Sequence, residues 1–268
     1  MHNAALASMA KADRSFSGWR YHALDVEPGD LKAAIERLGA LGFRGINLTV
    51  PHKVLAVGLV ADLDGIAREA GAVNTLLHEG GSWQGTNTDG YGLATAVGEE
   101  LGMGLSGVPV VILGAGGAAR AAAAECLRSG CAELWIVNRT RSKTDSLLAQ
   151  IAPLARAVPV RALDARRRAE GLAAGALLIN ATSVGLRADE PAPADLALFP
   201  GLSAVYDMIY NPPDTRLLAQ ARALGIRSAS GLGMLVHQGA RSLEFWTGVP
   251  APENAPAMRA AAAKALGY

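Results

Sequence analysis

The sequence VVILGAGGAAR, residues 110–120, decides the fold of the second half of the chain. Its four leading apolar residues predict a buried β-strand, and the alanines after the glycines predict the start of a helix. Gly114, Gly116 and Ala119 fit the pattern G-x-G-x-x-[GA], which binds dinucleotides where it joins a strand to a helix. There Gly114 permits the tight turn, and Gly116 lets the backbone approach a pyrophosphate bound by the free N–H groups of the helix. We therefore predict dinucleotide binding, with a purely structural glycine turn as the alternative.

Short apolar runs alternate with helical patterns along the whole chain, as in βαβ units that build a mostly parallel sheet. The strands expected in the second half are Val108 to Leu113, Glu133 to Val137, Ala157 to Arg161, Ala176 to Asn180 and Ala204 to Met208, with a short one near Ile226. The helices expected there run from about Gly117 to Ser129, through Leu232, Leu235 and Val236, and along the terminal alanine-rich stretch APAMRAAAAKALGY.

The first hundred residues predict a similar alternation. Leu31, Ile35, Leu38 and Leu41 recur at helical spacing, and Gly42 ends that helix. The elements expected after it are a strand in FRGINLTV (residues 43–50), helical stretches from about Val54 and Asp64, a hairpin in AVNTLLHEGGSWQGTNTDG with Gly80 and Gly81 as its turn, and a helix from Tyr91 to about Gly102. We place the boundary between two domains near Asp89.

The composition excludes several classes of protein. With 268 residues, half of them apolar, the chain can form two modest domains with sizeable cores. Its 25 basic and 24 acidic residues leave a net charge of +1, so neither nucleic acid nor an anionic membrane is expected as a partner. Cys126 and Cys131 form no CxxC pair, which argues against a disulfide framework or a metal site and favours the cytoplasm. The charged first twenty residues predict no signal peptide.

The residues after the second strand, Glu133 to Val137, decide which dinucleotide is expected. Enzymes that use NAD need a carboxylate there to bind the adenosine ribose 2′-hydroxyl. This chain has NRTRSK at residues 138–143, with no acidic residue before Asp145. Arginine and lysine side chains bind a 2′-phosphate through charge-assisted hydrogen bonds. A solvated basic helix start is the alternative, but cations near a helix N-terminus oppose its dipole, so we predict NADP.

Polar clusters occur in the first half at the ends of predicted strands or in turns. Taken singly, each has a structural explanation, because a lysine is commonly solvated and Asn, Asp and Gly favour turns and helix caps. Together they supply a cation, a carboxylate and neutral hydrogen-bonding groups, which the recognition of a small polyhydroxylated acid requires. The clusters are Asn47 with Thr49 and Lys53, Asn74 with Thr75, and Asn87 with Thr88 and Asp89.

Eight motifs extend over nearly the whole chain: NLTVPHK, AGAVNT, GTNTDG, GAGGAAR, NRT, INATSVG, YDMIY and GLGMLVHQ. In order and spacing they resemble the shikimate dehydrogenase family. The resemblance implies an α/β fold in which residues 1–88 plus 232–268 form a substrate domain with a mainly parallel sheet. Residues 89–231 would form a Rossmann-type domain that binds NADP, and the terminal helices would pack back on the first domain. The implied activity is the reversible reduction of 3-dehydroshikimate to shikimate by NADPH, in the biosynthesis of chorismate and the aromatic amino acids.

The resemblance also implies roles for single residues. Lys53 and Asp89 correspond to the catalytic pair, in which the lysine exchanges a proton with the reacting hydroxyl and the carboxylate holds and tunes the lysine. The implied substrate-binding residues are Asn47, Thr49, Asn74, Thr88, Tyr210 and Gln238. The implied cofactor-binding residues are Gly114, Ala115, Gly116, Gly117, Ala118, Asn138, Arg139, Thr140, Arg141, Lys143, Thr182, Met208, Gly231 and Met234. No metal is implied, and His52 and His237 are interpreted as structural.

Two alternatives stay open. One is a quinate/shikimate dehydrogenase that uses NAD, against which the missing carboxylate after Val137 argues. The other is a catalytically weak NADP-binding protein. In the preferred interpretation the partner is a small molecule, shikimate or 3-dehydroshikimate, and the protein is a monomer or a homodimer.

One part of the family pattern is not found. The family has a strand and then a Ser-x-Ser motif that binds the substrate carboxylate, just before HNA, whereas this chain has Met1, His2 and Asn3 in that region. Ser15 and Ser17 lie downstream, and we interpret their spacing as coincidence. We therefore expect a first domain without its first strand, of low stability and little turnover, and expect an upstream extension with the strand and motif to restore activity.

Overall fold

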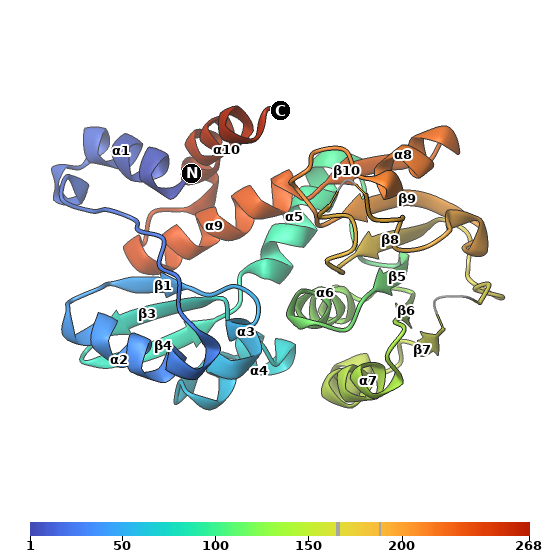
Figure 1. Ribbon diagram of the computed structural model, residues 1–268, viewed down its shortest axis with the longest axis horizontal. Helices are drawn as coiled ribbons and strands as arrows, with labels where there is room; N and C mark the ends of the chain where they lie inside the picture. The colour runs from blue at the N-terminus through green and yellow to red at the C-terminus, as the bar shows by residue number, and fades with distance from the viewer. Residues whose placement is uncertain (165–166, 188) are drawn as a thin grey trace.

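Two β-sheets, each covered by helices, make up the protein (Figure 1). The computed structural model describes residues 1–164, 167–187 and 189–268. The strand order is β1-β3-β4-β2 in the first sheet and β10-β9-β8-β5-β6-β7 in the second. Helices α5 (Asp89–Leu101) and α9 (Leu232–Thr247) lie where the two halves meet. The α/β class predicted from the sequence is confirmed.

The first half of the chain forms the smaller sheet and the helices around it. Its elements are α1 (His2–Ala12), α2 (Leu31–Ala40), β1 (Gly45–Asn47), α3 (His52–Leu55), β2 (Asp62–Leu63), α4 (Gly65–Ala70), β3 (Thr75–Glu79) and β4 (Ser82–Thr86). The expected hairpin is present, with Gly80 and Gly81 at positive φ between its strands. The strand expected over residues 43–50 ends at Asn47, because the chain turns soon afterwards into the short helix that carries Lys53.

The strand directions in the first sheet correct one expectation. The sequence predicts a mainly parallel sheet in the first domain, and this is wrong. Among the described strands, the pairs β1–β3 and β3–β4 are antiparallel, and β2–β4 is parallel. The tight turn between β3 and β4 is one physical reason, because a two-residue loop reverses the chain, whereas parallel strands need a long crossover.

The second sheet is parallel in all its pairings, as predicted. Its strands are β5 (Pro109–Leu113), β6 (Glu133–Val137), β7 (Val160–Leu163), β8 (Ala176–Asn180), β9 (Leu202–Asp207) and β10 (Arg227–Ser230). The helices around it are α6 (Gly117–Arg128), α7 (Arg141–Ala155) and α8 (Arg216–Ala223). Numbered along the chain from β5, the strand order is 3-2-1-4-5-6, which is the order of dinucleotide-binding Rossmann folds. The third strand begins at Val160, three residues later than the sequence predicts.

The central strands of this sheet are buried on both faces. Every residue of β5, β6 and β8 is buried. Ile112 and Ile136 belong to a core shared with α5 and α6, whereas Val111 and Trp135 pack with Phe199 in a second core. A strand that is buried on both faces has a continuous apolar sequence instead of an alternating one, and therefore VVIL and LWIV predict these strands correctly.

The last two helices pack back on the first half, as the resemblance implies. The Trp246 indole of α9 donates a hydrogen bond to the Leu76 carbonyl of β3 (2.8 Å). Gly45 of β1 lies against the same indole, where a Cβ atom would collide with the ring. Helix α10 (Ala251–Leu266) packs on α9 and on α1, so the first and last helices lie side by side (Figure 1). No helix in the described part of the chain has the length and apolarity to span a bilayer.

One edge of β1 borders a cavity. The cavity has a volume of about 140 Å³ and lies between the segment 20–26 and β1. Its walls are largely apolar, and they include Asn47 and Thr49. Because β3 is the strand paired with β1, this outer side of β1 is an edge of the sheet.

His2, the first residue of α1, is buried in a group of aromatic rings. Its ring stacks on Tyr21 at a centroid distance of 4.1 Å and an interplanar angle of 7°, and it also lies beside Trp246. Its Nε2 atom has no hydrogen-bond partner among the described residues. Burial lowers the pKa of His2 from 6.5 to about 4, so the fold holds the neutral ring.

The burial of His2 predicts an acid-sensitive contribution to stability. Its folded pKa lies below the unfolded one, so the unfolded chain binds the extra proton and stability falls as the pH falls from 6.5 to about 4. The loss is on the order of 3 kcal/mol. His2→Phe keeps a stacked ring that does not titrate. As the pH falls from 6.5 to about 4, the free energy of unfolding of the variant should therefore rise relative to that of wild type by this loss. Urea denaturation measures it, and a difference that does not change with pH would contradict the assignment.

Candidate functional site

The carboxyl ends of five parallel strands lie along one edge of the second sheet. The register pairs Leu113 of β5 with Val137 of β6 and with Asn180 of β8. Asp207 of β9 pairs with Asn180 on one side and with Ser230 of β10 on the other. Every cofactor-binding residue predicted from the sequence follows one of these strand ends. Because ligands of such sheets bind beyond the carboxyl ends of the strands, this edge is the candidate cofactor site.

The glycine turn has the geometry that a bound phosphate needs. Gly114 has a φ of 113°, and a Cβ atom there would lie 3.0 Å from the Ala181 carbonyl oxygen. Gly116 directly precedes α6, and a Cβ atom on it would meet nothing within 4 Å. This open space lies at the N-terminus of a twelve-residue helix, where free N–H groups favour an anion. The turn therefore fits the pyrophosphate of a dinucleotide.

Basic side chains follow the end of β6. Arg139 and Lys143 are exposed, and the described residues provide neither with a hydrogen-bonding or ionic partner. Arg141 is hydrogen-bonded to an aspartate one turn further along α7 (3.2 Å). The Asn138 side chain donates to the Thr140 carbonyl (3.0 Å), which fixes the turn into α7. Arg139 and Lys143 are thus available to an anionic ligand at this strand end.

The loops after β8, β9 and β10 bring the remaining cofactor candidates together. The Met208 N–H donates to the Asn180 carbonyl (3.0 Å), and the Thr182 hydroxyl donates to the Asn180 side chain (2.7 Å). Gly231 lies so close to Met208 that a Cβ atom would collide with the Met208 carbonyl. Met234 follows on the first turn of α9 and is buried.

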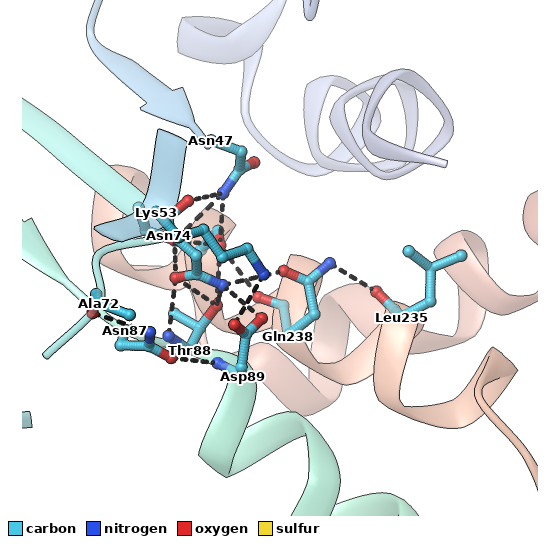
Figure 2. A network of polar contacts seen from close by, with 11 residues as sticks. Asn47, Lys53, Ala72, Asn74, Asn87, Thr88, Asp89, Leu235 and Gln238 are labelled. Carbon is cyan, nitrogen blue, oxygen red and sulfur yellow. Dashed lines mark hydrogen bonds and ion pairs between the residues drawn. The ribbon is translucent and has the colours of Figure 1, made fainter. Parts of the chain in front are cut away.

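A largely buried ion pair joins α3 to the start of α5 (Figure 2). Lys53 Nζ lies 2.7 Å from Asp89 Oδ2, and the two side chains are 15% and 3% exposed. Asp89 is the first residue of α5, where the helix dipole favours a carboxylate. The Lys53 carbonyl accepts the Val73 N–H (2.7 Å), which ties α3 to the chain just before β3. The two residues predicted to be catalytic are therefore in direct contact.

Asn74, which precedes β3, orients this carboxylate. Its Oδ1 accepts the backbone N–H of Thr88 (2.8 Å), and a backbone N–H can only donate. Its Nδ2 must therefore face Asp89 Oδ1, at 2.8 Å. One oxygen of Asp89 is thus held by Asn74 and the other by Lys53. The Asp89 N–H in turn donates to the Asn87 side chain (2.9 Å), which fixes the first turn of α5.

Asn47 is enclosed by hydrogen-bonding partners. Its Nδ2 lies 3.2 Å from the Asn74 carbonyl, 3.1 Å from the Thr75 hydroxyl and 3.0 Å from the Ser242 hydroxyl. Its Oδ1 accepts the Tyr21 hydroxyl (3.1 Å), and burial raises the pKa of Tyr21, which keeps this donor protonated. Because two N–H groups already serve three acceptors, the remaining lone pair of Oδ1 is what Asn47 can offer to a substrate.

The other predicted substrate-binding residues differ in position. The Thr88 hydroxyl accepts Asn74 Nδ2 (2.9 Å), and Gln238 of α9 reaches the same amide with its Oε1 at 3.4 Å (Figure 2). Thr49 is exposed and borders the cavity beside β1. Tyr210 is 38% exposed, and within the described residues its side chain takes no part in the network around Asp89. Asn74, Thr88 and Gln238 are thus gathered at the ion pair, and Thr49 and Tyr210 lie outside its hydrogen bonds.

Sequence reasoning misses Tyr21 and Ser242 and gives Thr75 no role. Ser242 lies four residues after Gln238, so helical spacing places both on one face of α9, and this was the available signal. No comparable signal marks Tyr21, because it lies in a segment without regular structure and reaches Asn47 across 26 residues.

The cofactor site and the ion pair are adjacent. A Cβ atom on Gly117 would lie 3.6 Å from Lys53 Cβ and 3.9 Å from Lys53 Cδ. Gly117 begins α6 directly after the open space at Gly116. The partly buried lysine therefore lies against the turn that fits a pyrophosphate. A parallel sheet with this turn beside a lysine–carboxylate pair defines a dinucleotide-dependent oxidoreductase, in which hydride transfer occurs next to a group that can exchange a proton.

Comparisons with known proteins agree with this class. Residues 1–76 match the family described as shikimate dehydrogenase substrate binding domain, residues 96–184 match shikimate / quinate 5-dehydrogenase, and residues 231–263 match shikimate 5'-dehydrogenase C-terminal domain. The shikimate dehydrogenase (NADP(+)) of Symbiobacterium thermophilum is 42% identical over 273 aligned residues, which cover 99% of this chain and 89% of that protein.

Two solved structures are similar over nearly their whole length. The shikimate 5-dehydrogenase of Thermus thermophilus in complex with NADP(H) and shikimate is 34% identical with a TM-score of 0.79, over 97% of this chain and 95% of that one. The 5-ketofructose reductase of Gluconobacter sp. strain CHM43 is also 34% identical with a TM-score of 0.79, over 96% and 92%. The family matches and the 42% identity with the Symbiobacterium enzyme show that this chain belongs to the shikimate dehydrogenase family.

Both histidines within the matched motifs have local structural partners. The Nε2 atom of His52 lies 2.9 Å from the Val26 carbonyl, and that of His237 lies 2.8 Å from Glu99. Among the residues that the structure describes, no group of three His, Cys, Asp or Glu side chains could hold a metal ion.

The close crossing of α5 and α9 gives a test of how the site is assembled. A Cβ atom on Gly92 would lie 2.8 Å from the Met234 carbonyl and 2.9 Å from Gln238 Cβ, whereas one on Gly98 of the same helix would meet nothing within 4 Å. Gly92→Ala should therefore destabilise the protein by about 1–3 kcal/mol. Gly98→Ala should stabilise it by roughly 0.5–1 kcal/mol, because alanine is the better helix former. Equal unfolding free energies for the two variants in urea would show that the crossing is not tight at Gly92.

Proposed function

We propose that this protein catalyses the reversible NADPH-dependent reduction of 3-dehydroshikimate to shikimate. The observation that carries the proposal is the largely buried pair of Lys53 and Asp89, placed against the glycine turn at Gly117. Membership of the shikimate dehydrogenase family and the likeness to a structure bound to NADP(H) and shikimate support the same substrate and cofactor.

The cofactor fits the carboxyl edge of the second sheet. The glycine turn at Gly114 and Gly116 takes the pyrophosphate, because the helix N-terminus and the open space beside it suit an anion. Arg139 and Lys143 bind the 2′-phosphate, which distinguishes NADP from NAD. Met208 and the other residues that follow β8, β9 and β10 border the nicotinamide end. When bound, the nicotinamide supplies the hydride.

Lys53 supplies the proton for the reduction and accepts it in the reverse direction. Of the two side chains in the pair, Lys53 is the less buried, whereas Asp89 is almost fully enclosed. Asp89, which is itself held by Asn74, keeps the ammonium in one place, so the proton can pass between Nζ and the reacting oxygen without a large movement. Proton transfer by a positioned group typically contributes about 10²–10⁴-fold to the rate.

Neutral groups recognise the substrate hydroxyls. Thr88 and Gln238 lie around the ion pair with Asn74, and we propose that they bind the ring hydroxyls next to the reacting carbon. Thr49 lies in the loop before α3 and Tyr210 in the loop after β9, and we propose that both contact the bound substrate.

The organisation of the molecule follows from this site. We propose that residues 1–88 plus 232–268 act as the substrate domain and that residues 89–231 act as the cofactor domain. The protein is proposed to work in the cytoplasm, since both cysteines are free and buried. A monomer or a homodimer is proposed, and sedimentation of the purified protein decides between them.

A second candidate substrate is another polyhydroxylated ketone. Apart from Lys53 and Asp89, which neutralise each other, the side chains hydrogen-bonded around this pair are uncharged. The equally similar structure of a 5-ketofructose reductase favours testing this class. Measuring kcat/KM for 3-dehydroshikimate and 5-ketofructose on one preparation distinguishes the two. A higher value for 5-ketofructose would overturn the proposed substrate, and NADP binding without turnover of either would favour a catalytically weak cofactor-binding protein.

Replacement of Lys53 tests the proton transfer. Lys53→Ala should lower kcat by about 10²–10⁴-fold with a smaller effect on KM, because it removes the group that exchanges the proton. Asp89→Asn should also lower kcat. In the double variant the two effects on kcat should not add, because the two groups act as a unit. Lys32→Ala, an exposed lysine on α2, is the matched control and should leave kcat unchanged. A near-normal kcat for Lys53→Ala in the NADPH absorbance assay would refute the assignment.

Replacement of Arg139 tests the cofactor choice. Arg139→Ala should weaken NADP binding by roughly 10–150-fold, because it removes a charge-assisted hydrogen bond of about 1.5–3 kcal/mol to the 2′-phosphate. Binding of NAD, which lacks that phosphate, should hardly change and serves as the internal control. Titration calorimetry with both dinucleotides measures the effect. An equal loss of affinity for NAD and NADP would show that Arg139 does not recognise the 2′-phosphate.

A further inference from the structure

Ser242 of α9 lies at the centre of the hydrogen bonds that support the substrate site, and none of the roles described above belongs to it. Its side chain is fully buried, with 0% exposure. Its Oγ lies 3.0 Å from Asn47 Nδ2, 2.8 Å from the Thr75 hydroxyl and 3.3 Å from the Thr88 hydroxyl. It also lies 3.0 Å from the Gln238 carbonyl. One hydroxyl thus contacts residues of β1, β3 and α9 and the residue that precedes α5.

The partners of Ser242 fix most of its hydrogen bonds. A carbonyl can only accept and an amide nitrogen can only donate, so the hydroxyl donates to Gln238 and accepts from Asn47. One lone pair remains, and the hydroxyls of Thr75 and Thr88 lie within reach of it. Because the site is buried, losing the hydroxyl would leave the Asn47 and threonine groups with fewer partners and no water to replace it.

Back-bonding along a helix accounts for only one of these contacts. Serine and threonine inside helices commonly bond the carbonyl four residues earlier, and Thr247 of α9 does so to Leu243 at 2.7 Å. Thr247 has no hydrogen bond to any residue of the substrate site among the described residues, and its other contact is the Val249 N–H (3.2 Å). Ser242 differs because three of its four contacts leave α9 and reach the residues around the ion pair.

Through these contacts, Ser242 links the position of α9 to the position of the substrate residues. Gln238 lies one turn before it on the same helix, and Gln238 also approaches the Asn74 amide at 3.4 Å. Thr88 binds Ser242 on one side and Asn74 on the other, and Asn74 holds the Asp89 carboxylate. A shift of α9 would therefore move Gln238 and loosen Thr88 together, while Lys53 would keep its direct contact with Asp89.

We propose that Ser242 is a positioning residue for substrate binding, which holds Asn47, Thr88 and the Gln238 turn of α9 in the arrangement that binds the substrate hydroxyls. This inference rests on the proposed function. It assigns Ser242 an effect on substrate affinity that acts through other residues, with little effect on the proton transfer by Lys53 or on the cofactor, whose pyrophosphate turn lies on the other sheet.

The experiment compares Ser242→Ala with Thr247→Val, the matched control on the same helix. Ser242→Ala should raise KM for shikimate by about 3–10-fold, because one or two buried hydrogen bonds around the binding groups are lost. Its KM for NADP should stay within about twofold of wild type, and the pH profile of kcat should not shift, because neither depends on this hydroxyl. Thr247→Val should lower the melting temperature without changing KM for shikimate. Thr75→Val combined with Ser242→Ala should raise KM by less than the product of the single effects, because the two hydroxyls share one contact.

Each outcome decides the inference. A KM for shikimate within about twofold of wild type in Ser242→Ala, whatever its melting temperature, would show a merely structural role and overturn it. Equal increases in KM for shikimate and NADP would overturn it too, because they indicate general distortion. Titration calorimetry with shikimate in the absence of cofactor measures affinity without turnover. Wild-type protein that neither binds nor oxidises shikimate would overturn the proposed function. If wild type is active and Ser242→Ala has the same KM for shikimate, only the role of Ser242 is overturned.

Discussion

The ion pair between Lys53 and Asp89 is the interaction on which the rest of the site depends. Removing two charges from water is expensive, and the cost is recovered only when each charge is paired and its remaining hydrogen-bonding groups are satisfied. Here Asn74 holds the second carboxylate oxygen and the start of α5 favours the negative charge. The fold must therefore bring together α3, the chain before β3 and the N-terminus of α5, which are not consecutive in sequence.

The second half of the molecule meets this pair through two helices and one glycine turn. The parallel register of β5, β6, β8, β9 and β10 collects their carboxyl ends along one edge, and α6 starts at that edge against Lys53. Helix α9 carries Met234 beside the cofactor edge and Gln238 beside Asn74. The close crossing of α9 with α5 at Gly92 keeps these two positions in a fixed relation. Backbone packing thus fixes how the ion pair lies relative to the carboxyl edge of the second sheet.

The sequence predicts the second half well and the first half less well, for a physical reason. Strands such as VVIL and LWIV are buried on both faces, so their apolar patterns are continuous and easy to recognise in the sequence. The first sheet has short, partly exposed strands, and strand direction there depends on pairing between distant segments, which local pattern does not encode. The motifs point to Lys53, Asp89, Asn74, Thr88 and Gln238. Ser242 is marked only by its helical spacing from Gln238, and Tyr21 enters the site through a tertiary contact alone.

A crystal structure of this protein with NADP and shikimate tests the central claim most directly. The account predicts that Lys53 Nζ lies within about 2.6–3.2 Å of the shikimate hydroxyl that becomes the ketone, while it still contacts Asp89. The nicotinamide should lie on the carbon that bears this hydroxyl, with the pyrophosphate at Gly116. A complex in which Lys53 points away from that hydroxyl, and another side chain occupies its place, would contradict the account.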